Sequence, residues 1–195
     1  MKISKAIIIF AILTYLALFS TIWLHEIGHA LVYFFYDCKE NLSVTVPLYF
    51  ANASPNPLIH ERVGNLNANQ IFQVSIAGIV VNIIFGLFSM LIVLIYKFHW
   101  NRFVLFFISI FGLTHFLEAS SYLTICNIIP LSDMIGIINY NKKIQLPLLF
   151  IGILIVLLMM YYIMKTRKEW RKFFVIYSII TFFIMGGLRL FFTLL

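Results

Sequence analysis

The chain has 195 residues, of which 63% are hydrophobic and only 11% are charged, and its formal net charge is +7. A soluble globular domain carries about 25% charged residues, so this composition excludes an ordinary soluble protein and predicts an integral membrane protein. The basic residues lie in short segments between apolar runs. The positive charge therefore indicates membrane topology, and no nucleic-acid partner is expected.

Five apolar runs are long enough to cross about 30 Å of hydrocarbon as helices. They cover roughly residues 6–36, 71–96, 103–126, 146–164 and 173–195. The sequence thus predicts an all-α membrane protein with about five transmembrane helices in a single domain, residues 1–195. A core of three helices and a surface loop (37–70) is expected over residues 6–140. Residues 146–195 would add two accessory helices.

The segment between the first two runs, residues 37–70, has a different character. Residues 42–50 (LSVTVPLYF) are rich in β-branched and aromatic residues, are interrupted by Pro47, and are followed by the turn-forming ANASPNP. This pattern predicts a short β-like segment at the membrane surface, with an interfacial loop as the alternative.

The distribution of lysine and arginine predicts an orientation. With a cytoplasmic N-terminus, nine of these residues fall in inside segments and four fall outside, namely Lys39, Arg62, Lys142 and Lys143. The positive-inside rule favours this arrangement, in a multi-pass protein that we expect in a bacterial or archaeal cell membrane. The balance depends on the basic cluster at 165–172, because the count without it is four against four.

Ionisable residues inside apolar runs are costly in lipid and mark candidate functional sites. The first run contains HEIGH at 25–29, in which His25 and His29 are four residues apart. On a helix these side chains share one face, about 5–6 Å apart, where two imidazoles can bind one zinc ion. Zinc lowers the pKa of a water toward 7, and Glu26 is placed to take its proton as the water attacks a peptide carbonyl. Gly28 would let another backbone approach closely.

A catalytic zinc ion has three protein ligands and one open position. The first candidate for the third ligand is Asp133, in NIIPLSDMIG at 127–136. Pro130 is expected to interrupt the helix there, and a broken helix at membrane depth is tolerated where it lines a buried or watery site. An ordinary aspartate in an external loop is the alternative.

His115 and Glu118, three residues apart in the third run, are a competing source of the third ligand. Glu118 can bind the metal as the distant glutamate does in soluble zinc proteases. Alternatively, the pair can hydrogen-bond the site from outside or pair with each other. We favour the outer hydrogen-bonding or mutual pairing role for His115 and Glu118. The reason is that a ligand role for Asp133 explains the helix break at Pro130, which a ligand role for Glu118 does not.

Asn82 lies in SIAGIVVNIIFG, where the small residues Ser75, Ala77 and Gly78 permit close helix packing. Its amide can hydrogen-bond a substrate backbone or a developing oxyanion. It can equally form an interhelical hydrogen bond with only a packing role, and both interpretations stay open.

Three motifs together resemble the site-2 protease family of intramembrane zinc metalloproteases. They are HEIGH at 25–29, AGIVVN at 77–82 and NIIPLSD at 127–133, in the family's order and over roughly residues 10–140. Ile79 stands where that family often has proline, and Met134 stands where it usually has glycine.

The resemblance implies a three-helix catalytic core with one zinc ion per chain, buried below the membrane surface. His25, His29 and Asp133 would bind zinc, Glu26 would be the general base, and Asn82 would help to orient the substrate. The implied substrate is a transmembrane or hydrophobic peptide that is cleaved in or near the lipid bilayer.

The same resemblance implies that residues 42–50 pair with an extended substrate strand. In well-known members, the zinc-motif end of the core helix faces the cytosol, whereas the charge count places that end outside. Two other functions remain open. One is a non-proteolytic metal-binding membrane protein (a pseudoenzyme, an immunity partner or a transport partner), although a pseudoenzyme is expected to have lost Glu26 or a ligand. The other is a zinc protease with Glu118 as a ligand.

Overall fold

The computed structural model describes the chain except for residues 1–2, 49–51, 97–100 and 195, and it leaves out the side chains of 3, 4, 96 and 186–194. Helices account for 80% of the chain, which confirms the all-α prediction. The elements are α1 Ile3–Phe35, α2 His60–Val63, α3 Ala68–Tyr96, α4 Arg102–Leu123, α5 Ile125–Ile128, α6 Asp133–Tyr140, η1 Lys142–Ile144, α7 Gln145–Lys165 and α8 Lys168–Leu194.

Four helical segments of the described chain are long and apolar enough to cross a membrane. They are Lys5–Phe35, Ala68–Ile95, Arg102–Ile128 and Lys142–Lys165, which agrees with an integral membrane protein. Helix α8 is a further long helix. Part of the run at 173–195 lies outside the described side chains, so the fifth span remains a prediction.

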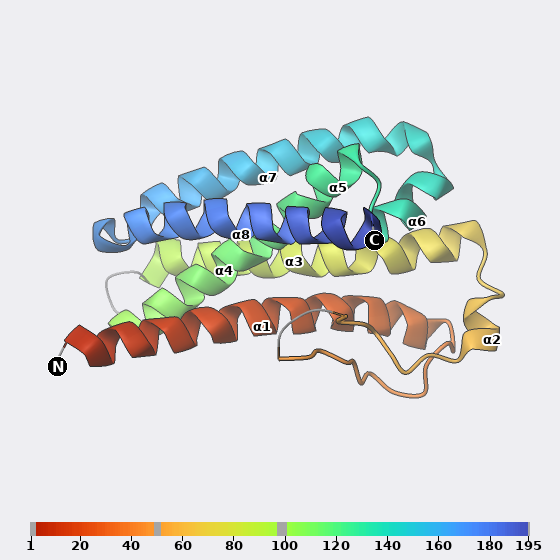
Figure 1. The fold of residues 1–195 in the computed structure, drawn as a ribbon, viewed down its shortest axis with the longest axis horizontal. Helices are drawn as coiled ribbons and strands as arrows, with labels where there is room; N and C mark the ends of the chain where they lie inside the picture. Colours follow the sequence, from red (N-terminus) through yellow and green to blue (C-terminus); the bar gives the residue numbers. More distant parts are fainter. Residues whose placement is uncertain (1–2, 49–51, 97–100, 195) are drawn as a thin grey trace.

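The long helices run side by side along the long axis of the molecule, with α4 in the middle (Figure 1). Helix α4 contacts α1, α3, α7 and α8, and α1 and α3 also contact each other. From Gly112 to Leu123 every residue of α4 is buried. A helix that is buried all round is typical of the centre of a bundle, so groups on this half of α4 must be satisfied by neighbouring helices.

Two ends of the bundle can be distinguished in Figure 1. One end holds the C-terminal end of α1, the short helix α2, the α5–α6 break and the start of α7. The N-terminus and the turn between α7 and α8 lie at the other. Successive long helices run in opposite directions along the bundle, as the apolar runs predict for membrane-crossing helices.

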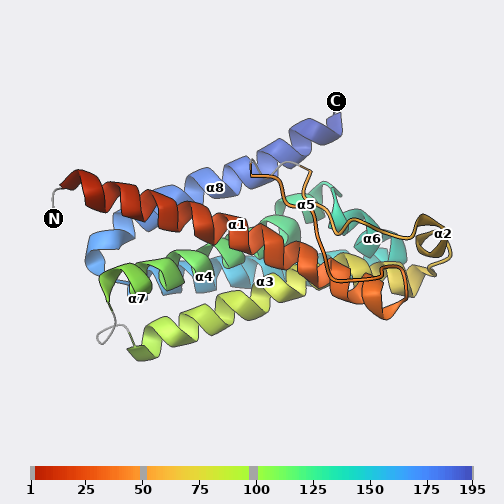
Figure 2. The same ribbon diagram turned by 90° about the horizontal axis from the view of Figure 1, so that it is seen from below.

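The segment that follows α1 folds back beside the C-terminal half of that helix (Figures 1 and 2). The Tyr15 hydroxyl donates to the carbonyl oxygen of Leu48 at 3.0 Å. Thr45 and Ser54 form an isolated antiparallel bridge with two 2.9 Å hydrogen bonds. The expected β-like segment is thus reduced to one bridge in its described part, and residues 49–51 lie outside that part.

A buried lysine fixes the same segment. The Lys39 ammonium donates to the carbonyl oxygens of Pro55 and, at 2.7 Å, of Pro57. Burial lowers the pKa of Lys39 below its usual value. Prolines supply carbonyls but no backbone N–H, which explains why this turn-rich stretch cannot extend a strand ladder.

Candidate metal centre

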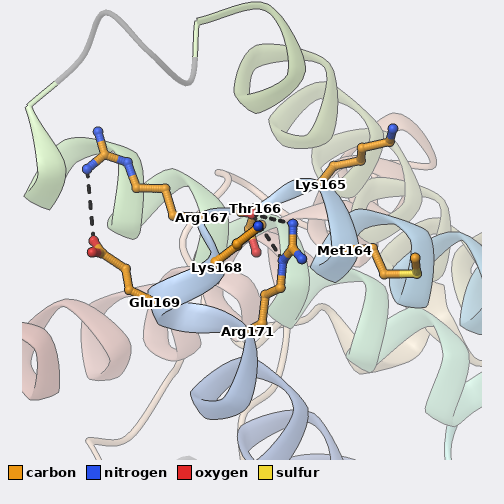
Figure 3. Close-up of a pocket in the computed structure, with 7 residues that line it drawn as sticks. All are labelled: Met164, Lys165, Thr166, Arg167, Lys168, Glu169 and Arg171. Carbon is orange, nitrogen blue, oxygen red and sulfur yellow. Dashed lines mark hydrogen bonds and ion pairs between the residues drawn. The ribbon is translucent and has the colours of Figure 1, made fainter.

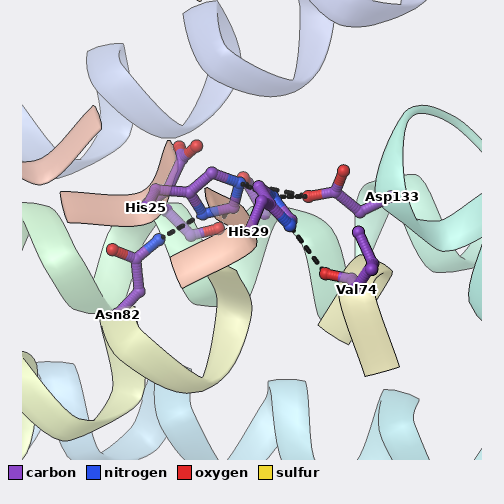
Figure 4. Close-up of polar contacts among 7 residues, drawn as sticks. His25, His29, Val74, Asn82 and Asp133 are labelled. Carbon is purple, nitrogen blue, oxygen red and sulfur yellow. Dashed lines mark hydrogen bonds and ion pairs between the residues drawn. The ribbon is translucent and has the colours of Figure 1, made fainter. Parts of the chain in front are cut away.

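Three side chains from two distant parts of the chain, His25 and His29 of α1 and Asp133 of α6, converge on one another (Figure 4). The Nε2 atoms of His25 and His29 are 3.0 Å apart. The Asp133 carboxylate oxygen Oδ2 lies 3.1 Å from Nε2 of His25 and 3.2 Å from Nε2 of His29. Within the described residues, these three form a group that could hold a metal ion.

The dimensions of this triangle fit a small cation. A tetrahedral ion with bonds of about 2.0–2.1 Å separates its ligand atoms by roughly 3.3–3.4 Å. The three observed separations of 3.0, 3.1 and 3.2 Å reach that range when the side chains move outward by a few tenths of an ångström. Two imidazoles and one carboxylate also leave one tetrahedral position for a further ligand, as in catalytic zinc sites.

Helix α3 fixes the protonation of one candidate ligand. The Nδ1 atom of His29 lies 2.7 Å from the carbonyl oxygen of Val74. A carbonyl only accepts hydrogen bonds, so Nδ1 carries the hydrogen and, in the neutral ring, Nε2 carries the lone pair. That lone pair faces His25 and the Asp133 carboxylate, which accepts as well. The convergence therefore calls for a cation, either a metal ion or a second proton on His29.

The third member of the group, Asp133, lies outside the candidate spans and is partly buried. Burial raises the pKa of its carboxyl group, but His29 and His25 lower it more strongly, so the pKa lies well below its usual range. An ionised carboxylate is the form that binds a metal ion.

The side-chain amide of Asn82 links His25 to a second buried histidine, His115. The side-chain amide of Asn82 lies 3.0 Å from Nδ1 of His25 and 2.7 Å from Nδ1 of His115. In the structure the amide nitrogen faces His25, which places the hydrogen of that ring on Nε2. Metal binding at Nε2 requires the opposite tautomer, with the amide turned so that Oδ1 accepts from His25 and Nδ2 donates to His115.

Aromatic rings enclose His115. Phe85 stacks on it at a centroid distance of 5.4 Å, and Phe111 meets it edge-on at 4.4 Å. His115 is fully buried, and its Nε2 has no hydrogen-bond partner among the described atoms. The hydrogen-bond partner of His115 in the structure is the Asn82 amide, which in turn contacts His25.

The remaining candidates are buried in the same region. Glu118 is 2% exposed but does not belong to the group that could hold a metal ion. Glu26 is 8% exposed, and its carboxylate interacts electrostatically with His25, His29 and Asp133. Glu26 is therefore near the triangle without being part of it.

Two glycines allow α1 and α3 to approach closely enough to build the site. A Cβ atom at Gly28 would lie 2.9 Å from the carbonyl oxygen of Ala77, which confirms the expected backbone approach. A Cβ atom at Gly78 would lie 2.6 Å from Cε1 of His25 and 2.7 Å from Nε2 of His29. Real Cβ atoms are not found this close to other heavy atoms, so both positions favour glycine.

A strained turn presents Asp133 to the histidines. Helix α5 ends at Ile128 and α6 begins at Asp133, which confirms the break expected at Pro130. Ser132, between them, has φ 51° and ψ −129°, and the N–H of Met134 donates to the carbonyl oxygen of Leu131 at 3.1 Å. This is the conformation of the first central residue of a type II′ turn, where glycine is preferred.

Three contributors to the site were not predicted from the sequence. Val74 acts through its carbonyl, which any residue supplies, so no sequence signal marks it. Tyr122 stacks on the His25 ring at a centroid distance of 5.1 Å with an interplanar angle of 6°. The small residues before it, Ala119, Ser120 and Ser121, were the sequence feature that could have indicated close packing there. Ser132 gave none, because serine is ordinary in a turn.

Comparison of the chain with protein-family models, with curated proteins and with solved structures found no match.

Proposed function

We propose that the protein is an intramembrane zinc metalloendopeptidase of the site-2 protease type. The observation that carries the proposal is the convergence of His25 Nε2, His29 Nε2 and the Asp133 carboxylate within 3.2 Å of one another. The hydrogen bond from Nδ1 of His29 to the Val74 carbonyl leaves the lone pair of Nε2 directed into that triangle. The His29 lone pair and the Asp133 carboxylate are acceptors that meet in a buried place and need a cation. A divalent metal would satisfy both and would also bind His25 Nε2 once that ring takes the opposite tautomer.

In this proposal His25, His29 and Asp133 hold one zinc ion per chain. When bound, zinc would supply Lewis acidity toward a water molecule and a peptide carbonyl. A carboxylate oxygen of Glu26 takes a proton from the attacking water and passes it to the nitrogen of the departing peptide segment. Glu26 suits this role because it is nearly buried and adjacent to the first ligand.

The contacts of Asn82 favour a positioning role over substrate orientation. Its amide is fully buried and bonds His25 on one side and His115 on the other. We infer that Asn82, held by His115, fixes the ring and tautomer of His25, as outer partners do for metal-binding histidines. Glu118 then remains outside the ligand set.

The substrate class proposed is a transmembrane or hydrophobic peptide. Support comes from the location of two of the three candidate ligands, His25 and His29, on α1, a helix apolar enough to cross a membrane. Residues 42–48 and 52–54 lie beside the C-terminal half of that helix, and we propose that they guide an extended substrate to the site. We also propose a cytoplasmic N-terminus, from the charge count.

A non-proteolytic metal-binding membrane protein is the second candidate, since the triangle alone requires only a cation. Purified protein in liposomes with hydrophobic model peptides distinguishes the two, with products detected by mass spectrometry. Metal-dependent cleavage that is lost in Glu26→Gln supports the peptidase. A stoichiometric metal ion without cleavage of any peptide in a diverse transmembrane set supports the alternative.

A further inference from the structure

A basic hollow lies at the opposite end of the bundle from the metal centre. It has a volume of about 790 Å³ and is lined by residues 164–169 and Arg171, at the turn between α7 and α8 (Figure 3). The proposed peptidase reaction makes no use of these residues.

The residues that line the hollow carry more positive than negative charge. It includes four cationic side chains and one carboxylate, Glu169, which pairs with Arg167 at 3.9 Å. In the part of the chain that the structure describes, no carboxylate pairs with Lys165, Lys168 or Arg171. Three cations therefore surround the hollow without a counter-charge.

One of these cations is held in place by the turn itself. The Nε and Nη2 atoms of Arg171 each lie 3.4 Å from the carbonyl oxygen of Thr166. Figure 3 shows the Arg171 and Lys168 side chains directed toward Thr166, whereas the Lys165 side chain extends away from that residue. A guanidinium fixed beside a lysine ammonium is a suitable partner for a phosphate, because it can donate several hydrogen bonds at once.

The position of the hollow indicates what the phosphate belongs to. It lies at the end of the candidate membrane span Lys142–Lys165, the depth at which lipid headgroups are found. The Lys165 ammonium lies 5.2 Å from the ring of Tyr161, and the Arg167 guanidinium lies 5.4 Å from the ring of Trp170. Tyr161 and Met164 are 46% and 65% exposed on α7, which leaves an apolar path for an acyl chain.

We propose that this hollow binds the headgroup phosphate of an anionic phospholipid. Lys165, Lys168 and Arg171 bind the phosphate, and the exposed surface of α7 packs against the lipid chain. Basic clusters at the membrane edge attract anionic lipids roughly fivefold more strongly for each cation near the surface. Loss of three cations is thus expected to lower the affinity by roughly 100-fold.

The test measures lipid binding to the whole protein in a mild detergent. Wild type, the triple variant Lys165→Gln/Lys168→Gln/Arg171→Gln and the matched control Lys142→Gln/Lys143→Gln are titrated with phosphatidylglycerol or phosphatidylcholine. Bound lipids are counted by native mass spectrometry. The control removes two lysines from a hollow of about 420 Å³ at the other end of α7. Thermal unfolding verifies that all three proteins are folded.

The expected result is a preference of wild type and control for phosphatidylglycerol that disappears in the triple variant. Equal binding of the two lipids by wild type would overturn the proposal, as would an unchanged preference in the folded triple variant. Displacement of phosphatidylglycerol by millimolar inorganic phosphate would identify a site for free phosphate and would also overturn it. If the triple variant does not fold, the single variant Lys168→Gln, with an expected loss of roughly fivefold, replaces it.

Discussion

The Nδ1 atom of His29 lies 2.7 Å from the backbone carbonyl oxygen of Val74. This contact joins α1 to α3 and fixes which nitrogen of His29 is available to a cation. Because the acceptor is a backbone atom, its position depends on how closely the two helices pack. The packing glycines are therefore as important to the proposed site as the ligands themselves.

Gly78→Ala is expected to abolish metal binding. The added methyl group would lie 2.6 Å from the His25 ring and 2.7 Å from Nε2 of His29, so the rings must move out of the triangle. The measurement is zinc per chain in purified protein, with Gly64→Ala as control. A Cβ at Gly64 would meet its nearest atoms at 3.6 Å, an ordinary contact. Full zinc content in folded Gly78→Ala would contradict the packing argument.

Ser132→Gly is expected to be tolerated, and Ser132→Val is not. The φ of 51° is unfavourable for any residue with a Cβ and worst for a β-branched one. We expect glycine to raise the free energy of unfolding by up to about 1 kcal/mol and valine to lower it by about 1–3 kcal/mol. Denaturant unfolding followed by circular dichroism measures both. The reverse order of stability would show that the turn is not strained.

Asn82→Ala and His115→Ala are each expected to weaken zinc binding by roughly 10–100-fold without removing a ligand. The reason is that the Asn82 amide contacts Nδ1 of His25 and is itself held by His115, so both residues orient the His25 ring. Competition with a chelator measures the affinity, and the spectrum of the cobalt-substituted protein reports ligand geometry. Ser89→Ala, a buried position two turns along α3, is the control. A wild-type affinity and cobalt spectrum in both site variants would leave the two residues with a packing role only.

Much of the helical architecture was predictable because long apolar runs have few alternatives in a membrane. The break at Pro130 and the close approach at Gly28 were predictable for the same kind of reason, since proline and glycine limit what the backbone can do. HEIGH was identified because ionisable groups are conspicuous in apolar runs. Asp133 was identified because it follows the helix break expected at Pro130.

The contacts that depend on three-dimensional packing were not predictable. The Val74 carbonyl has no sequence signature, and the partner of His115 was expected to be Glu118 or the site in general, whereas the structure shows Asn82. The β-like character of residues 42–50 depended on a partner strand, and the described segment offers only the Thr45–Ser54 bridge. Strand preference is realised only when such a partner exists.

Glu26→Gln is expected to retain zinc and to lose peptide cleavage by a factor of roughly 100 to 10,000. The amide keeps the size of the side chain but cannot accept the proton from water. Cleavage of hydrophobic peptides in liposomes and zinc content are measured on the same preparations. Cleavage at the wild-type rate in this variant would end the proposed role of Glu26.

The most direct test of the account is zinc content per chain in detergent-purified wild type, Asp133→Ala and Glu118→Ala, prepared side by side without chelators. We expect close to one zinc ion in wild type, its loss in Asp133→Ala and its retention in Glu118→Ala. Folded wild-type protein without zinc would contradict the proposed metal centre and would leave a second proton on His29 as the cation in the triangle. Retention in Asp133→Ala together with loss in Glu118→Ala would contradict the ligand set.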